Sequence, residues 1–502
     1  MQDTETRDPQ PSGTANPAVT PPLAPPFPSL VIAEDGFAAQ GAFAEAQAMY
    51  LQPDTAAVAR LDALLETHAI GVVAHFYMDA ELQGVLSSAK SPHIHIADSL
   101  MMADRAVAMA EAGARTIVVL GVDFMSENVR ATLDAAGHRD VAVYRVASKP
   151  IGCSLAESAE APAYAAYLKR ASRSPRALHV IYVNTSLQIK ARAQALVPTL
   201  TCTSSNVVPM VLQAFAQVPE LQIFFGPDTY MGQNLTAMLR ALSALDADSI
   251  TRLHPEHTPA SLAQALPRFH HFQQGVCIVH HMFGDRVVER VRRDYADAFI
   301  TAHLEVPGEM FGLGFEAQRQ GRGVVGSTSN ILRFITDTIA AKINQKDGER
   351  PRFILGTESG MVTSVARAVQ QILREHGGSG LEAEIVFPVA SEAIARTDDA
   401  SLPIVPGVAG GEGCTTAGGC ATCPYMKMNS LDALFDLLER IDAAGQAATD
   451  TLAAYRPKDY SERIDGKSVA ELGAVSILHM REFQKTGRLP AALVEDIINR
   501  GA

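Results

Sequence analysis

The sequence predicts an α/β protein of three αβα domains, related by a pseudo-threefold axis, each with a short parallel sheet. Two observations support this fold class: one series of motifs occurs three times along the 502 residues, and its spacing is nearly constant. Each copy has an apolar strand with a polar end, a short hydroxyl or carboxylate motif, a second strand and a cysteine. Repetition at a fixed period indicates homologous units.

The three copies align on the residues that close their first strands, which are His75, Tyr182 and His303. The short polar motifs follow after 23, 22 and 24 residues, at Asp98, Ser204 and Ser327. The first copy consists of VVAHFY (72–77), ADS (97–99), VVLGVDFM (118–125) and Cys153. The second consists of HVIYVNTS (179–186), TSS (203–205), IFFGPDTYMG (223–232) and Cys277. The third consists of AFITAHLE (298–305), STS (327–329), FILGTESGM (353–361) and Cys423.

These copies set the expected domain boundaries. Residues 1–50 are rich in proline, threonine and alanine, which predicts a disordered extension. We expect the first αβα domain at 55–150, the second at 151–240 and the third, with the CxxC segment, at 241–430. Residues 431–502 have an amphipathic helical pattern, and we expect them to pack on the first domain without a catalytic role.

Composition excludes some classes of partner. The formal net charge of −13 argues against binding of nucleic acid, which needs a basic surface. No run of eighteen apolar residues occurs, so no membrane span is expected, and the N-terminus does not have the pattern of a secretory signal. These features predict a cytoplasmic protein that acts on small molecules.

The polar ends of the strands predict where the chemistry lies. In parallel α/β units, ligands bind at the carboxyl ends of strands and at the N-termini of the helices that follow. The motifs ADSL, CTSSN and GSTSN place hydroxyls or a carboxylate directly before expected helices. We therefore expect these motifs to cap the helices and to hold anions.

Six cysteines are too few for a disulfide scaffold in a chain of this length. Cys420 and Cys423 form a CxxC, which taken alone is typical of a zinc loop or a redox pair. The repeat favours another arrangement, because Cys153, Cys277 and Cys423 each come from one unit and can converge on the common axis. We interpret Cys202 as a small buried hydrophobic residue.

Three converging thiolates without a fourth predict a [4Fe-4S] cluster at the centre of the three domains, with one iron left open. Clusters that carry electrons use four cysteines. An open iron is a Lewis acid that can bind a substrate oxygen and help to expel water. The sequence thus predicts a dehydration catalyst.

More than ten motifs between about residues 60 and 440 resemble, in order, the quinolinate synthase family, the A protein of NAD biosynthesis. They are AHFYMDAELQ, ADSL, LGVDFM, GCSLAES, YVNTS, TCTSSN, GVCIVHH, HLE, GSTSN, LGTESGM and CPYMKMN. The resemblance implies three αβα domains around a [4Fe-4S] cluster held by three cysteines. It also implies condensation of iminoaspartate with dihydroxyacetone phosphate to quinolinate, and a transient contact with the aspartate oxidase that supplies iminoaspartate.

The resemblance also implies roles for single residues. The cluster ligands would be Cys153, Cys277 and Cys423. The catalytic residues would be His75, Tyr77, His303 and Glu305, with the Glu305 carboxylate as general base and the Tyr77 phenol in proton transfer. The substrate-binding residues would be Ser99, Tyr182, Asn184, Ser204, His280, Ser327 and Thr328. Cys414 and Cys420 resemble extra cysteines of some members, where a reversible disulfide is one reading.

Two other classes stay open at this point. Diphthamide-synthesis enzymes and the terminal reductase of isoprenoid synthesis also place one cysteine per domain around an open iron. The second class is a non-enzymatic metal-binding module that uses the CxxC, although this interpretation leaves the strand-end Tyr, His and Glu residues unexplained. For Glu358, in GTESGM, the sequence does not distinguish a contact with substrate from a supporting role.

Overall fold

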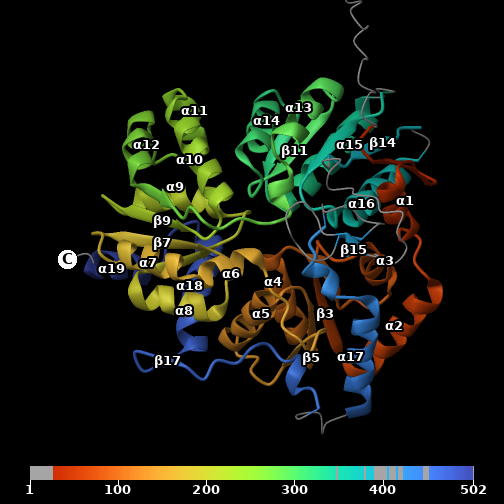
Figure 1. Cartoon of the computed structure of the whole chain (residues 1–502), viewed down its shortest axis with the longest axis horizontal. Helices are drawn as coiled ribbons and strands as arrows, with labels where there is room; N and C mark the ends of the chain where they lie inside the picture. Colours follow the sequence, from red (N-terminus) through yellow and green to blue (C-terminus); the bar gives the residue numbers. More distant parts are fainter. Residues whose placement is uncertain are drawn as a thin grey trace, which may run out of the picture.

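The computed structural model shows a mixed α/β protein in which three groups of strands and helices lie side by side (Figure 1). It describes residues 26–345, 349–377, 380–388, 404–405, 414–415, 422–444 and 451–500. The expected α/β class with short parallel sheets is confirmed. A pseudo-threefold relation between the groups stays a prediction.

The first sheet has the strand order β4-β3-β5-β6, and all its strands are parallel. Its central strand β3 (Ile70–His75) is buried along its whole length, as its unbroken apolar run predicts. The other strands are β4 (Ile94–Ala97), β5 (Thr116–Leu120) and β6 (Ala142–Arg145). The helices of this part are α2 (Thr55–His68), α3 (Ala80–Ser88), α4 (Ser99–Glu111) and α5 (Asp123–Ala135). Asp54, Asp79 and Asp98 cap α2, α3 and α4, each by accepting backbone N–H groups.

The second sheet has the order β8-β7-β9-β10 and is also parallel. Its strands are β7 (Ala177–Tyr182), β8 (Thr199–Cys202), β9 (Gln222–Gly226) and β10 (Phe269–His271). Its helices are α6 (Ser154–Glu160), α7 (Pro162–Ala171), α8 (Leu187–Leu196), α9 (Val207–Gln217), α10 (Thr229–Ser243), α11 (Ala247–Leu253) and α12 (Pro259–Ala265). Because β10 pairs with β9, the second sheet extends past residue 240, where we expected the third domain to begin.

The third sheet has the order β12-β11-β13-β14-β1-β2. Its parallel strands are β11 (Phe299–His303), β12 (Gly323–Gly326), β13 (Arg352–Gly356) and β14 (Ala383–Val386). The helices are α13 (Asp285–Asp294), α14 (Gly308–Arg319), α15 (Thr328–Gln345) and α16 (Met361–Glu375). The described part also contains two short paired strands, β15 (Ile404–Val405) and β16 (Cys414–Thr415).

A hairpin near the start of the chain completes the third sheet, which corrects the expected disorder of residues 1–50. β1 (Ser29–Ile32) pairs antiparallel with β14 and with β2 (Phe37–Gln40), and α1 (Ala42–Met49) follows. The run SLVI is apolar enough to be buried, and β1 pairs with a strand far away in the sequence. Residues 1–25 lie outside the described part.

The C-terminal segment joins two of the three groups. α17 (Leu431–Ala444) lies against α2, as we expected of this segment. However, α18 (Val469–Thr486) packs mainly on α8 and β8 of the second group and also on α5. The last helix, α19 (Ala491–Arg500), contacts α8 through a hydrogen bond from the Arg500 side chain to the backbone carbonyl of Gln194. A short hairpin, β17 (Arg463–Ile464) and β18 (Lys467–Ser468), precedes α18.

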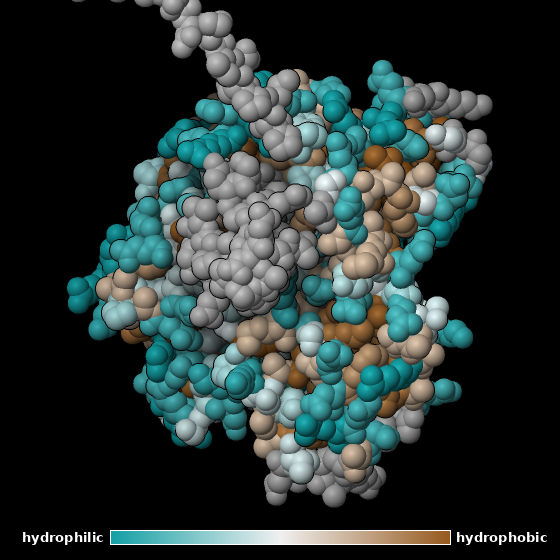
Figure 2. Space-filling view, turned by 45° about the vertical axis from the view of Figure 1, so that its right-hand side comes forward, coloured by the Kyte–Doolittle hydropathy of each residue, from teal (hydrophilic) through white to brown (hydrophobic). Residues whose placement is uncertain are grey.

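One apolar core runs through all three groups. The largest cluster of buried residues includes Val72 of β3, Leu178 of β7 and Ile300 of β11, each less than 5% exposed. Hydrophilic residues cover much of the outer surface in the view of Figure 2, beside smaller hydrophobic areas. No helix in the described parts of the chain is long and apolar enough to cross a membrane.

The three sheets share one strand order. In each, the first strand of the copy is central, the second lies at an edge, and the third lies on the other side of the first. His75, Tyr182 and His303 are therefore the last residues of the corresponding strands β3, β7 and β11. This placement brings three polar strand ends into one region.

Candidate active site

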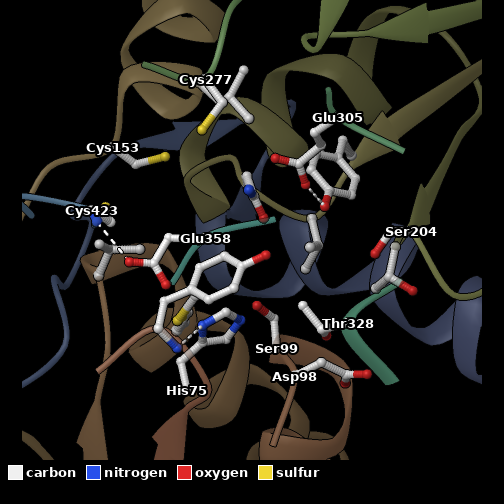
Figure 3. A pocket seen from close by; sticks show the side chains of 18 of the residues that line it. His75, Asp98, Ser99, Cys153, Ser204, Cys277, Glu305, Thr328, Glu358 and Cys423 are labelled. Carbon is white, nitrogen blue, oxygen red and sulfur yellow. Dashed lines mark hydrogen bonds between the residues drawn. The ribbon is translucent and has the colours of Figure 1, made fainter. Parts of the chain in front are cut away.

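The polar strand ends of all three groups line one pocket with about 740 Å³ of empty space. Figure 3 shows the three cysteines at one side of this pocket and the hydroxyl and carboxylate side chains of Ser99, Asp98, Thr328 and Ser204 at the other. The lining includes His75, Tyr77, Tyr182, Asn184, His280, His303, Glu305 and Glu358. Of the residues predicted from the sequence, Ser327 is the one that does not line it.

The three cysteines from the three repeats line the same side of the pocket (Figure 3). Burial raises the pKa of the Cys153 thiol to about 11 and that of Cys423 to about 12, and it also raises the pKa of Cys277. The neighbouring thiols and Glu305 add to the shift of Cys277. Among the described residues no Lys or Arg offsets this burial, so a bound metal ion would favour the thiolates.

Each cysteine loop is fixed by a side chain that follows the third strand of its own repeat. The Asp123 carboxylate accepts a hydrogen bond from the backbone N–H of Ile151 at 3.1 Å, two residues before Cys153. The Thr229 hydroxyl accepts one from the N–H of Gly275 at 3.0 Å, two residues before Cys277. This role was not predicted from the sequence, although G-x-Asp or G-x-Glu after the third strand marks the anchors Asp123 and Glu358; in the second repeat the anchor is the residue after that motif, Thr229.

In the third repeat the anchor reaches the cysteine itself. The Glu358 carboxylate accepts a hydrogen bond from the N–H of Cys423 at 2.8 Å and one from the N–H of Gly360 at 2.7 Å. A Cβ atom at Gly360 would lie 2.7 Å from the Cα atom of Tyr77, so glycine is required at this contact. Burial raises the pKa of Glu358 to about 8, although the two N–H groups favour its charged form. In the structure Glu358 lines the pocket and supports Cys423.

Glu305 is the most connected side chain of the site. Its carboxylate accepts a short hydrogen bond from the Tyr182 hydroxyl and lies 3.0 Å from Nδ1 of His280. Burial would raise its pKa, but the adjacent His303 and His280 and the hydrogen bonds outweigh burial and lower the pKa of Glu305. The carboxylate is therefore ionised, as a general base must be at neutral pH. The partner phenol keeps its proton, because burial and Glu305 raise the pKa of Tyr182.

His280 and His303 form a stacked pair beside Glu305, with ring centroids 4.9 Å apart. His303 accepts the N–H of Glu305 at its Nδ1 (3.4 Å) and lies with Nε2 3.2 Å from the Ser204 hydroxyl. Nε2 of His280 is buried and has no hydrogen-bond partner among the described residues. This nitrogen is free to bind a ligand.

His75 and Tyr77 stand on the opposite wall of the pocket. Nδ1 of His75 accepts the N–H of Tyr77 at 3.2 Å, and burial lowers the pKa of His75 to about 4. The Tyr77 hydroxyl lies 3.1 Å from the hydroxyl of Thr357, which comes from the third repeat. Burial, reinforced by Glu305, raises the pKa of Tyr77, so its phenol stays protonated.

The hydroxyl motifs do not all face the pocket. Ser99 and Thr328 line it as the first residues of α4 and α15, and Ser204 lines it three residues before α9 begins. Ser327 instead donates a hydrogen bond to the Asn330 side chain at 2.8 Å and accepts one from the Asn330 N–H, so it serves as a helix cap. Sequence spacing alone does not separate this cap from its neighbour Thr328.

The described residues also contain a compact group suited to a metal ion. The ligand atoms of Cys277, His280 and Glu305 lie within 4.8 Å of one another, whereas the three cysteine sulfurs do not form such a group. Cys202 is fully buried in the apolar core, as expected. The suggested disulfide of Cys414 with Cys420 falls partly outside the described residues.

Comparison with known proteins gives a family for this chain. The sequence profile described as "Quinolinate synthetase A protein" matches residues 59–378. The chain belongs to this family. A chloroplastic quinolinate synthase of Nicotiana tabacum is 53% identical over 489 residues, which are 95% of this chain and 67% of the relative. A chloroplastic quinolinate synthase of Arabidopsis thaliana is 51% identical over 94% of this chain and 67% of its own length.

A quinolinate synthase of the cyanobacterium Cyanothece is 26% identical over 74% of this chain and 81% of its own length. These matches confirm the resemblance seen in the sequence, and the chain is an enzyme of the quinolinate synthase kind. They also contradict the expected cytoplasmic location, because four matched plant relatives are named chloroplastic.

Proposed function

We propose that the chain condenses iminoaspartate with dihydroxyacetone phosphate to quinolinate, phosphate and two waters, at a [4Fe-4S] cluster bound by Cys153, Cys277 and Cys423. The observation that carries this proposal is the convergence of one cysteine from each repeat with Tyr77 and Glu305 on one buried pocket. An aspartate oxidase as transient source of iminoaspartate is part of the proposal.

The arrangement of the cysteines fits a cluster better than a single ion. A tetrahedral zinc site has Zn–S bonds of about 2.3 Å and so brings its sulfurs to about 4 Å from one another. Among the described residues, the three cysteine sulfurs do not lie within 4.8 Å of one another as a group. A cluster, which spreads its thiolates over several irons, accommodates the wider spacing. When bound, the open iron would supply a Lewis acid for the loss of hydroxide.

The acid and base groups lie on opposite walls, as a condensation with several proton transfers requires. The ionised Glu305 can take a proton from a carbon next to a carbonyl or imine. The protonated phenol of Tyr77 can give a proton to a leaving or carbonyl oxygen. Tyr182, bound to Glu305, orients this base and keeps it within the pocket.

Both proposed substrates are anions, and the hydroxyl side of the pocket suits them. Ser99 and Thr328 are the first residues of α4 and α15, where backbone N–H groups and the helix dipole favour negative charge, and the Ser204 hydroxyl lies in the turn before α9. The side-chain amide of Asn184 can donate a further hydrogen bond to a carboxylate.

An anaerobic reconstitution tests the proposal. The full chain should take up about four irons and make quinolinate from the two substrates. Single Cys153→Ser, Cys277→Ser or Cys423→Ser changes should reduce the iron content and abolish product, whereas Cys202→Ala should keep both. Zinc without iron, or a loaded cluster without quinolinate, would refute the assignment.

A further inference from the structure

One carboxylate joins all three repeats at the end of the pocket remote from the cysteines. Oδ2 of Asp98 accepts a hydrogen bond from the Ser329 hydroxyl at 2.9 Å and a longer one from the Ser205 hydroxyl at 3.5 Å. Asp98 precedes α4, Ser205 follows β8, and Ser329 lies in the first turn of α15. The contact therefore links the first, second and third sheets through a single oxygen atom.

This contact lies at the mouth of the pocket. Asp98 and Ser205 both line it, and Ser205 is the exposed residue of that lining in the described part of the chain. Ser329 is exposed as well. Figure 3 places Asp98 across the pocket from Cys153, Cys277 and Cys423.

The carboxylate is fixed, while the serines belong to other units. Oδ1 of Asp98 accepts the N–H groups of Leu100 (3.1 Å) and Met101 (2.9 Å), so it caps α4 and cannot turn away. Opening the mouth thus requires Ser205 and Ser329 to move with their own units. The hydrogen bonds that resist this motion are exposed, and water can replace them.

We propose that Asp98, Ser205 and Ser329 form a latch that closes the pocket mouth in the free protein and is released when an anionic ligand takes over the serine hydroxyls. A carboxylate or phosphate group can accept the two serine hydroxyls in place of Oδ2 of Asp98, and a neutral molecule cannot do so equally well. The identity of the anions rests on the proposed function, but the latch rests on the hydrogen bonds alone.

The test uses the full chain without metal and measures how fast its pocket thiols react. Asp98→Asn retains a good helix cap but replaces Oδ2 by an NH₂ group, which cannot accept a serine hydroxyl. Iodoacetamide and iodoacetate are similar in size and differ in charge, and mass spectrometry resolves the labelling of each cysteine. Asp54→Asn is the matched control, since Asp54 caps α2 in the same way at an exposed site.

We expect Asp98→Asn to speed iodoacetamide labelling of Cys277 by about 3–10-fold, because local opening becomes easier. Iodoacetate labelling should rise by a further factor of about 3, because a negative charge has left the mouth. Ser329→Ala should speed both reagents equally, since it loosens the latch without a change of charge. Asp54→Asn should leave all rates unchanged.

Unchanged rates in Asp98→Asn would overturn the latch. A gain for iodoacetate alone would also overturn it, because the mouth would then repel anions without being closed. Cys202, which is fully buried elsewhere, reports on unfolding, and its labelling in parallel with Cys277 would refute the local effect. Loss of iron uptake or of quinolinate formation would count against the proposed function and leave this result untouched.

Discussion

The ends of β3 and β11 carry the same backbone arrangement with different chemistry. In both, a buried histidine closes the strand and accepts at Nδ1 the N–H group of the residue two positions later, at 3.2 Å for His75 and 3.4 Å for His303. Both rings therefore carry their proton on Nε2, and burial lowers the pKa of His75 to about 4 and that of His303 to about 3. The residue two positions later is Tyr77 in one case and Glu305 in the other.

The exchange of Tyr77 for Glu305 at equivalent positions gives the two strand ends different protonation states. Burial keeps the Tyr77 phenol protonated, whereas the hydrogen bonds from His280 and Tyr182 favour the ionised form of Glu305. The end of β7 is a third version, with Tyr182 in place of the histidine and Asn184 two positions later. The ends of the three corresponding strands thus bring a phenol, a carboxylate and an amide to one pocket.

The largest effect is expected from removal of the base. Glu305→Gln keeps the size of the side chain but cannot take a proton, so kcat should fall by about 10²–10⁴-fold. Steady-state quinolinate formation measures this loss, and iron content should not change. The matched control is Glu309→Gln, an exposed residue in the first turn of α14, which should keep full activity. A Glu305→Gln enzyme with normal kcat would remove Glu305 from the base role.

The two neutral histidines make the protein sensitive to acid. The pKa values of His75 and His303 in the folded protein lie below that of a histidine in the unfolded chain. As the pH falls, the unfolded chain therefore takes up these protons at a higher pH than the folded protein does, and the free energy of unfolding decreases from about pH 6.5 toward pH 4. For His75 the loss should be on the order of 3 kcal/mol by pH 4. Urea unfolding between pH 7 and 4 measures it, and His75→Gln should flatten this pH dependence. The same slope in both proteins would show that His75 is not the group responsible.

Loss of the phenol should have a smaller effect. Tyr77→Phe removes the hydroxyl but keeps the ring, so kcat should fall by about 10–100-fold while the cluster stays bound. Because the pKa of Tyr77 is raised, wild-type activity should not decline up to pH 9 through loss of this proton. A Tyr77→Phe enzyme with wild-type kcat would show that another group donates the proton.

The smallest effect is expected at the contact that orients the phenol. Thr357→Val removes the hydroxyl that lies 3.1 Å from the Tyr77 oxygen at nearly constant volume, and kcat should fall by about 2–5-fold. Thr363→Val is the control, because its buried hydroxyl has no hydrogen-bond partner among the described residues. Equal kcat values for the two variants would mean that Thr357 does not position Tyr77.

The sequence predicted the strands, their polar ends and the converging cysteines because these depend on local pattern and on the repeat. It did not predict that β1 belongs to the third sheet, since a four-residue apolar run after a proline-rich stretch has no local signal for its partner. It predicted that Ser327 and Thr328 both bind substrate, whereas in the structure Ser327 caps the helix and only Thr328 of the two lines the pocket. Which of two adjacent side chains faces the pocket depends on the geometry of the first helical turn. The support of Cys423 by Glu358 depends on the docking of distant loops, which no spacing encodes.

The pairing of β1 with β14 also bears on synthesis of the chain. Ser29 leaves the ribosome long before its partner Val386 exists, by on the order of 20–70 s at ordinary translation rates. During that interval β14 is missing, so β1 can pair only with β2, and its other edge is an open apolar strand edge of the kind that favours aggregation. The nascent third sheet can close only near the end of translation, so newly made chains should be most in need of chaperones before residue 386 emerges.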